Sequence, residues 1–171
     1  MNTLELPPSW PDPAPTEILP GPWQGGTSES SLLGQPTKLG HYRGKRPFDL
    51  IVTLYADAQP APWGVEEIRY GFPDAELDPH DLDRVREIAA YAAARWHRGD
   101  SVLIRCQAGV NRLGLVKALI LLADGWPPHE IVEHLRSCRS FHVLSNDFRA
   151  AVFHRGESGD QNLAAVRGIT V

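Results

Sequence analysis

The sequence contains very few cysteines and no long hydrophobic run. Cys106 and Cys138 are the two cysteines among 171 residues, which excludes a disulfide framework and is typical of a reducing compartment. No apolar run reaches the roughly 18 residues that a membrane span needs, and the N-terminal residues lack the charged-then-apolar pattern of a signal peptide. We therefore expect a cytoplasmic protein that does not bind membranes.

Excess positive charge and grouped metal ligands are also missing. The net charge is −4 and the pI is about 5.9, which argues against a surface that binds nucleic acid non-specifically. The seven histidines are scattered along the chain, so no cluster with the spacing of a metal site stands out. We expect no metal, no cofactor and no nucleic-acid partner. Nothing indicates oligomerisation, so a monomer is the default expectation.

The composition divides the chain into three parts. Residues 1–16 are rich in proline and predict an extended arm. Residues 17–154 contain the periodic apolar segments and are long enough for one domain with a substantial core. Residues 155–171 are polar and glycine-containing, and we expect a tail without a fixed structure of its own.

Strand and helix patterns alternate within residues 17–154. Residues 48–55 are β-branched and apolar, as in a buried strand, and a second strand is predicted at residues 66–70. Asp78 followed by Pro79 predicts a helix start, and apolar residues at three- and four-residue spacings from Leu82 to Trp96 predict its buried face. Two further short strands are expected within residues 18–26 and another strand at 102–104. Helices are expected from about 113 to 125, from Pro127 or Pro128 with Ile131, Val132 and Leu135 facing inward, and over 146–153. This order predicts an α/β fold, with a central, mostly parallel sheet flanked by helices.

The most informative stretch is residues 102–125. A short apolar strand leads into a polar loop with Cys106 and Arg112 at its ends, and an apolar helix follows. A loop of this kind leaves backbone N–H groups pointing into its hollow, where they bind anions and stabilise a thiolate. Arg112 supplies a planar fork for two phosphoryl oxygens, and Gly109 permits positive φ in the turn. The alternative is that Cys106 is a small buried core residue.

These residues resemble the cysteine-dependent protein tyrosine and dual-specificity phosphatases. Cys106, Gly109, Arg112 and Gly114 match the family's phosphate-binding loop, which lies between a central strand and a helix. The resemblance implies that Cys106 is the nucleophile and that Arg112 holds the phosphoryl group. The loop amides share that binding role, which gives the substrate-binding set Gln107, Ala108, Gly109, Val110, Asn111 and Arg112.

Two positions of the loop depart from the family pattern. Arg105 stands where histidine is usual, and we interpret it as an exposed residue at a strand end. Leu113 stands where a serine or threonine is usual. Since leucine cannot donate a hydrogen bond to the departing sulfur, hydrolysis of a phosphorylated enzyme is expected to be slow. Both changes bear on the level of activity more than on its type.

A phosphate ester also needs a proton donor for its leaving oxygen. Four aspartates precede Cys106 at suitable places, namely Asp57, Asp74, Asp78 and Asp81. Asp78 and Asp81 are expected in a helix cap, and Asp57 in a turn. By the resemblance, Asp74 in the Phe-Pro-Asp segment is the general acid. A surface turn aspartate is the alternative.

The pattern therefore predicts a phosphoprotein phosphatase that forms a cysteinyl-phosphate intermediate and requires no metal. Its expected partner is a phosphorylated protein, with phosphotyrosine as substrate and phosphoserine or phosphothreonine left open. The alternative is a catalytically impaired, phosphatase-like module that binds a phosphorylated partner. Outside the loop, Arg139 either faces the substrate or is a surface arginine. Cys138 is expected to serve packing, because a disulfide requires close approach of the two cysteines.

Overall fold

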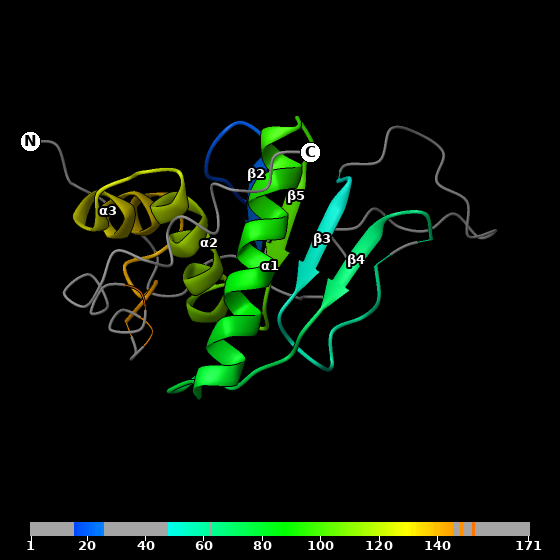
Figure 1. Ribbon diagram of the computed structural model, residues 1–171, viewed down its shortest axis with the longest axis horizontal. Coiled ribbons are helices and arrows are strands. Elements are labelled where there is room, and N and C mark those ends of the chain that lie inside the picture. The colour runs from blue at the N-terminus through cyan, green and yellow to red at the C-terminus, as the bar shows by residue number, and fades with distance from the viewer. Residues whose placement is uncertain (1–15, 26–47, 62, 146–147, 149–151, 153–171) are drawn as a thin grey trace, which may run out of the picture.

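The computed structural model describes residues 16–25, 48–61, 63–145, 148 and 152 (Figure 1). In chain order its elements are β1 (Thr16–Glu17), β2 (Pro22–Gly25), β3 (Leu50–Thr53), β4 (Glu66–Arg69), α1 (Pro79–His97), β5 (Val102–Arg105), α2 (Asn111–Ala123) and α3 (Pro128–Cys138). The expected tail and nearly all of the expected N-terminal arm lie outside the described residues. The expected helix over 146–153 is described only at Phe148 and Val152, which are helical and buried.

The sheet has the strand order β1-β2-β5-β3-β4. β2, β5, β3 and β4 are mutually parallel, and β1 alone pairs antiparallel with β2. The short connection from β1 to β2 includes Gly21 with φ +101°, a left-handed conformation that glycine adopts without steric cost. The prediction of a mostly parallel α/β sheet is confirmed, although β1 (Thr16–Glu17) lies just before residues 18–26, where both short strands were expected.

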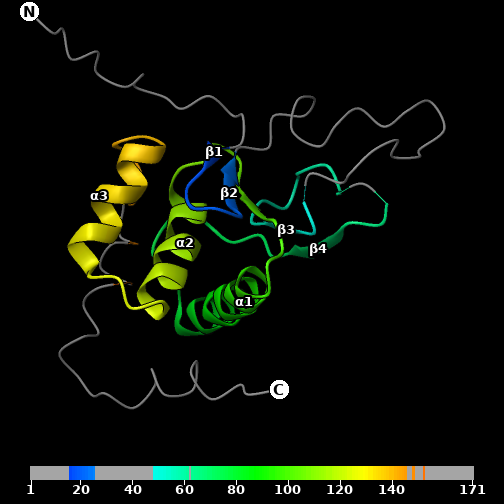
Figure 2. The ribbon, with the colours of Figure 1, turned by 90° about the horizontal axis from the view of Figure 1, so that it is seen from above.

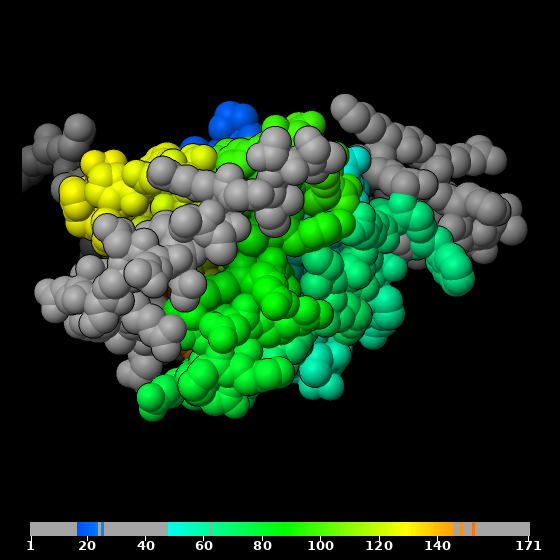
Figure 3. Space-filling model, in the orientation of Figure 1, coloured from blue at the N-terminus to red at the C-terminus, as the bar shows by residue number. Residues whose placement is uncertain are grey.

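The helices form layers on one face of the sheet (Figures 1 and 2). α1 packs on β3 and β5, α2 packs beside α1 on β5, and α3 lies on the outer side of α2. In the space-filling view the green atoms of α1 lie in the middle of this face, and the region of β3 and β4 (cyan) lies beside them (Figure 3). Leu50, Val52, Ile104, Val85 and Leu115 join the sheet, α1 and α2 in one buried core.

Helix α1 follows the sequence prediction closely. The carboxylate of Asp78 accepts a hydrogen bond from the backbone N–H of Asp81 at 2.8 Å, as an N-cap does. Its buried face is formed by Leu82, Val85, Ile88, Ala89, Ala92 and Ala93. Trp96, expected on the same face, is only partly buried, and its indole N–H donates to the carbonyl of Pro20 at 3.1 Å.

The two later helices are also confirmed with small shifts. α2 begins at Asn111 rather than Leu113 and ends at Ala123. α3 buries Ile131, Val132 and Leu135 as expected. Among the described residues, no helix is long and apolar enough to cross a membrane.

Candidate active site

Cys106 directly follows β5, and α2 begins five residues later at Asn111. Successive side chains of a strand point to opposite faces, so Cys106 joins Val102 and Ile104 in the core beneath the helices. It is 2% exposed. Gly109 has φ +68°, the left-handed conformation that the sequence predicted for this turn.

The backbone amides of the loop are available for a ligand. In the described part of the chain, no backbone or side-chain acceptor takes a hydrogen bond from the amides of residues 107–112. The adjoining amides are engaged, since Cys106 N–H donates to Gly25 at 3.3 Å and Gly114 N–H donates to Val110 at 3.2 Å. Val110 caps α2 without a side-chain hydrogen bond. A row of unpaired amides at a helix N-terminus attracts an anion.

Arg112 is held over this loop from two neighbouring segments. Its Nη1 donates to the carbonyl oxygens of Leu54 at 3.1 Å and Phe72 at 3.2 Å. Its guanidinium carbon lies 5.4 Å from the centre of the Tyr55 ring, within the range of a cation–π contact. Arg112 is only 9% exposed, yet its Nε has no hydrogen-bond partner among the described residues. A buried donor without a partner is costly, so Nε is the natural contact for a bound oxyanion.

Asp74 is exposed and lies in the turn between β4 and α1. Phe72, two residues earlier, is buried against Phe148 with ring centres 6.0 Å apart. Because the Phe72 carbonyl accepts from Arg112, the Phe-Pro-Asp segment is attached to the arginine of the loop. Asp57, another candidate acid, is exposed in the connection from β3 to β4.

The other two candidate acids have structural tasks. Asp78 caps α1. The carboxylate of Asp81 accepts from the Tyr70 hydroxyl at 2.5 Å, and this bond raises the pKa of Tyr70. These contacts agree with the expectation that Asp78 and Asp81 serve the start of the helix.

The expectation that Arg105 is exposed is wrong. Arg105 is 3% exposed and points to the sheet face opposite Cys106, because the two residues are consecutive in an extended segment. Its Nε donates to Thr53 Oγ1 at 2.9 Å, and its Nη2 donates to Glu67 Oε1 at 3.1 Å. The pairing of β3 with β5 places Thr53 directly opposite Arg105. A buried carboxylate across the sheet therefore explains why an arginine is tolerated there.

Leu113 and Gly114 are both enclosed by packing. Leu113 is 0% exposed, and its side chain carries no hydrogen-bond donor. A Cβ on Gly114 would lie 2.8 Å from Val143 Cγ1, closer than side chains approach. Gly114 thus lets the segment after α3 lie directly against α2.

Residues 139–145 contact the loop that runs from Cys106 to Arg112. Arg139 Nε donates to the carbonyl oxygen of Gly109 at 3.1 Å, and the N–H of Ser145 donates to Asn111 Oδ1 at 3.3 Å. Arg139 is therefore in contact with the loop backbone, a contact that a plain surface arginine does not make. Cys138 is half-buried with its sulfur 3.8 Å from His134 Nε2, and both cysteines are free.

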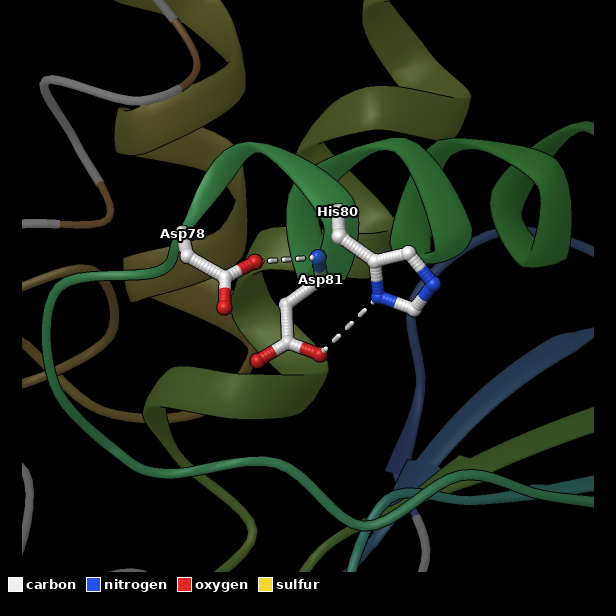
Figure 4. A group of neighbouring side chains, drawn as sticks. All are labelled: Asp78, His80 and Asp81. Carbon is white, nitrogen blue, oxygen red and sulfur yellow. Dashed lines mark hydrogen bonds and ion pairs between the residues drawn. The ribbon is translucent and has the colours of Figure 1, made fainter.

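One group of side chains that could act as metal ligands lies at the start of α1. Asp78, His80 and Asp81 place ligand atoms within 4.8 Å of one another at the start of α1 (Figure 4). They come from one stretch of sequence and lie at the surface. The carboxylate of Asp78 caps the helix, and that of Asp81 accepts a hydrogen bond from Tyr70. Both carboxylates therefore have a structural role at the start of α1 that requires no metal.

Three contributors to this site were not among the residues predicted from the sequence. Tyr55 and the Leu54 carbonyl contact Arg112, and Glu67 binds the arginine beside the nucleophile. The available signal was the end of the strand predicted at residues 48–55, since the carboxyl ends of parallel strands meet at one sheet edge.

Solved structures of dual-specificity and tyrosine phosphatases share this fold over most of the chain. Human DUSP28 has this fold, with a TM-score of 0.64, 20% identity, and coverage of 86% of this chain and 92% of that chain. DUSP15 gives a TM-score of 0.72 at 16% identity, covering 94% of this chain and 99% of that chain.

A phosphatase-like protein is also among the structural neighbours. The human tyrosine phosphatase-like serine/threonine/tyrosine-interacting protein gives a TM-score of 0.61 at 17% identity, covering 82% of this chain and 94% of that chain. No protein-family model and no curated protein sequence matches this chain. At these identities the comparisons establish the fold.

Proposed function

We propose that this protein is a cysteine-dependent phosphomonoester hydrolase that acts on phosphorylated proteins. The proposal is supported by the buried Nε of Arg112, which has no hydrogen-bond partner among the described residues. It lies in the same loop as Cys106 and as backbone amides that no described acceptor engages. These donors suit a tetrahedral oxyanion, and the sulfur of Cys106 supplies a nucleophile.

The proposed reaction has two in-line displacements. The Cys106 thiolate attacks phosphorus and the bond to the leaving oxygen breaks, while Asp74 gives its proton to that oxygen. Water then attacks the cysteinyl phosphate, Asp74 takes a proton from it, and the sulfur leaves as thiolate. Arg112 and the amides of residues 107–112 hold the remaining phosphoryl oxygens in both steps.

The proposed substrate is phosphotyrosine in a protein, with phosphoserine and phosphothreonine as further candidates. Gln107, Ala108, Val110 and Asn111 carry no charge, so the loop offers no lysine for the additional phosphates of an inositol lipid. The net charge of −4 argues against RNA as a substrate.

Hydrolysis of para-nitrophenyl phosphate in the presence of EDTA tests the proposal. We expect turnover by the native protein, no turnover by Cys106→Ser, and unchanged turnover by Cys138→Ser, which removes the other cysteine as a matched control. If the native protein hydrolyses the ester no faster than Cys106→Ser does, the proposed phosphatase activity is refuted. A phosphotyrosine peptide and its phosphoserine and phosphothreonine counterparts then define the substrate.

A phosphate-binding module without turnover is the second candidate. Leu113, which removes the usual hydroxyl donor, favours it, and one structural neighbour is described as phosphatase-like. For this candidate, a phosphopeptide binds the native protein, the unphosphorylated peptide does not, and no phosphate is released. Weaker binding by Arg112→Met would locate the peptide in the loop.

A further inference from the structure

A buried group of charges lies on the sheet face opposite Cys106. Its centre is Glu67, whose Oε1 accepts from Thr53 Oγ1 at 2.6 Å, Arg69 Nη1 at 2.9 Å and Arg105 Nη2 at 3.1 Å. The side chains of Arg105 and Glu67 are 4% and 12% exposed. Two guanidinium groups therefore share one carboxylate, and the Arg105 side of the pair is nearly excluded from water whereas the Arg69 side chain is 35% exposed.

The strand register produces this arrangement. Thr53 is aligned with Arg69 on β4 and with Arg105 on β5, so these three side chains form a row across the carboxyl ends of the strands. Glu67 lies two residues before Arg69 and hence on the same face. Cys106 follows Arg105 directly but points to the other face.

Arg69, Glu67 and Arg105 form hydrogen bonds with the backbone of the connection that follows β3, residues 56–61. Arg69 Nη2 donates to the carbonyl oxygens of Ala56 at 3.1 Å and Ala58 at 2.7 Å. The backbone N–H of Ala61 donates to Glu67 Oε2 at 2.9 Å, and Arg105 Nη2 also donates to the carbonyl of Gln59. Residues 56–61 are thereby fixed at several backbone positions.

The same connection carries the groups that orient Arg112. The N–H of Leu54 donates to the carbonyl of Arg105 at 2.9 Å, and the carbonyl of Leu54 accepts from Arg112. The next residue, Tyr55, places its ring against the Arg112 guanidinium. The side chain of Arg105 contacts this segment on both sides of Leu54 and Tyr55, through the Thr53 hydroxyl and the Gln59 carbonyl. Leu54 and Tyr55 in turn contact Arg112.

We infer that Arg105, paired with Glu67, is a positioning residue of the active site. It fixes residues 54–61 so that the Leu54 carbonyl and the Tyr55 ring hold the Arg112 guanidinium with Nε toward the oxyanion. The inference rests on the proposed function for its catalytic consequences, and on the contacts alone for the orientation of Arg112.

The protonation behaviour of the pair is consistent with this role. Burial raises the pKa of Glu67, but hydrogen bonds from Thr53, Ala61 and Arg105 outweigh it and the pKa is lowered. Burial lowers the pKa of Arg105, and the hydrogen bond and charge of Glu67 offset this only in part, so the pKa remains below its usual value. Each group keeps the other charged in a poorly solvated site.

The test compares Arg105→Met with Arg84→Met. Arg105→Met leaves Glu67 paired with Arg69, so no isolated buried charge results. Arg84 forms an exposed ion pair with Glu87 on α1 and is the matched control. Thr53→Val, which removes the hydroxyl between Arg105 and Glu67 while keeping the shape, is a milder second variant.

Three measurements are made on each variant. They are kcat/KM for para-nitrophenyl phosphate, the dissociation constant for inorganic phosphate, and the NMR resonance of the Arg112 Nε–H without ligand. In Arg105→Met we expect kcat/KM to fall and the phosphate dissociation constant to rise, each on the order of 10-fold to 100-fold. Arg105→Lys should recover part of both losses, and Thr53→Val should give smaller losses. The Arg112 resonance should move in Arg105→Met and Thr53→Val but not in Arg84→Met.

The outcomes separate the inference from the proposed function. If the native protein shows no turnover, the proposed phosphatase activity is refuted. The Arg112 resonance still tests the positioning role of Arg105 in that case. The inference is overturned if that resonance stays in place in folded Arg105→Met or Thr53→Val. It is equally overturned if an active native protein loses no phosphate affinity in these variants, or if Arg84→Met shows the same losses.

Discussion

Arg112 donates from Nη1 to the carbonyl oxygen of Phe72 at 3.2 Å, across 40 residues of sequence. This hydrogen bond joins the loop of the proposed nucleophile to the segment of the proposed acid. Asp74 follows Phe72 by two residues and is exposed. The bond therefore gives a physical reason to prefer Asp74 over the aspartates that serve the start of α1.

Asp74→Asn is expected to reduce kcat by about 10²-fold or more for phenyl phosphate. The loss should be smaller for para-nitrophenyl phosphate, because nitrophenolate leaves without full protonation. Steady-state kinetics with both esters measures the difference, and Asp57→Asn is the matched control in the neighbouring connection. Equal losses for the two esters, or a larger loss in Asp57→Asn, would remove Asp74 as the general acid.

Leu113→Ser is expected to speed the breakdown of the phosphorylated enzyme, since a hydroxyl beside the sulfur can donate to it as it leaves. The same change opens a cavity at a fully buried position and should lower the free energy of unfolding by about 3 kcal/mol. Rapid-quench trapping measures the intermediate, and denaturant unfolding measures the stability. Native protein that accumulates no phosphoenzyme, with no gain in turnover for the variant, contradicts the expectation.

Gly114→Ala is expected to destabilise the protein although alanine favours helices. The new Cβ would meet Val143 Cγ1 at 2.8 Å, and the overpacking should lower the free energy of unfolding by ~1–3 kcal/mol. Adding Val143→Ala removes the close contact, so the double variant should lose less stability than the two single changes predict together. Additive losses in urea unfolding would show that the contact at Gly114 is not the cause.

Lys117→Met is expected to stabilise the protein near neutral pH. Lys117 is 1% exposed, and its Nζ has no hydrogen-bond partner among the described residues. Burial lowers the pKa of Lys117 from 10.5 to about 7. Between these values the unfolded chain binds more protons than the folded one, so the free energy of unfolding should rise with pH across this window.

The methionine variant should lack that rise and should be more stable at pH 7 by ~1–3 kcal/mol, the cost of an unpaired buried polar group. Denaturant unfolding of native protein and variant from pH 7 to pH 10 measures both effects. Arg98→Met removes an exposed charge at the end of α1 and is the control. Parallel pH dependence in the native protein and Lys117→Met would show that Lys117 is not the titrating group.

Local sequence determined the elements and the outline of the candidate loop. Asp78 and Pro79 marked the start of α1, and apolar spacing gave the buried residues of α3. The strand, the turn at Gly109 and the helix around Cys106 could be predicted in the same way. Caps, left-handed turns and apolar periodicity act over a few neighbouring residues, so a single sequence displays them.

Only the tertiary structure decided which distant residues surround that loop. The burial of Arg105 depends on a strand register that places Thr53 and Glu67 beside it. The contacts of Arg112 with Leu54 and Phe72 depend on how separate loops meet at one sheet edge. Charge pairing of this kind arises from the packing of segments far apart in the chain, and no local pattern in the sequence encodes it.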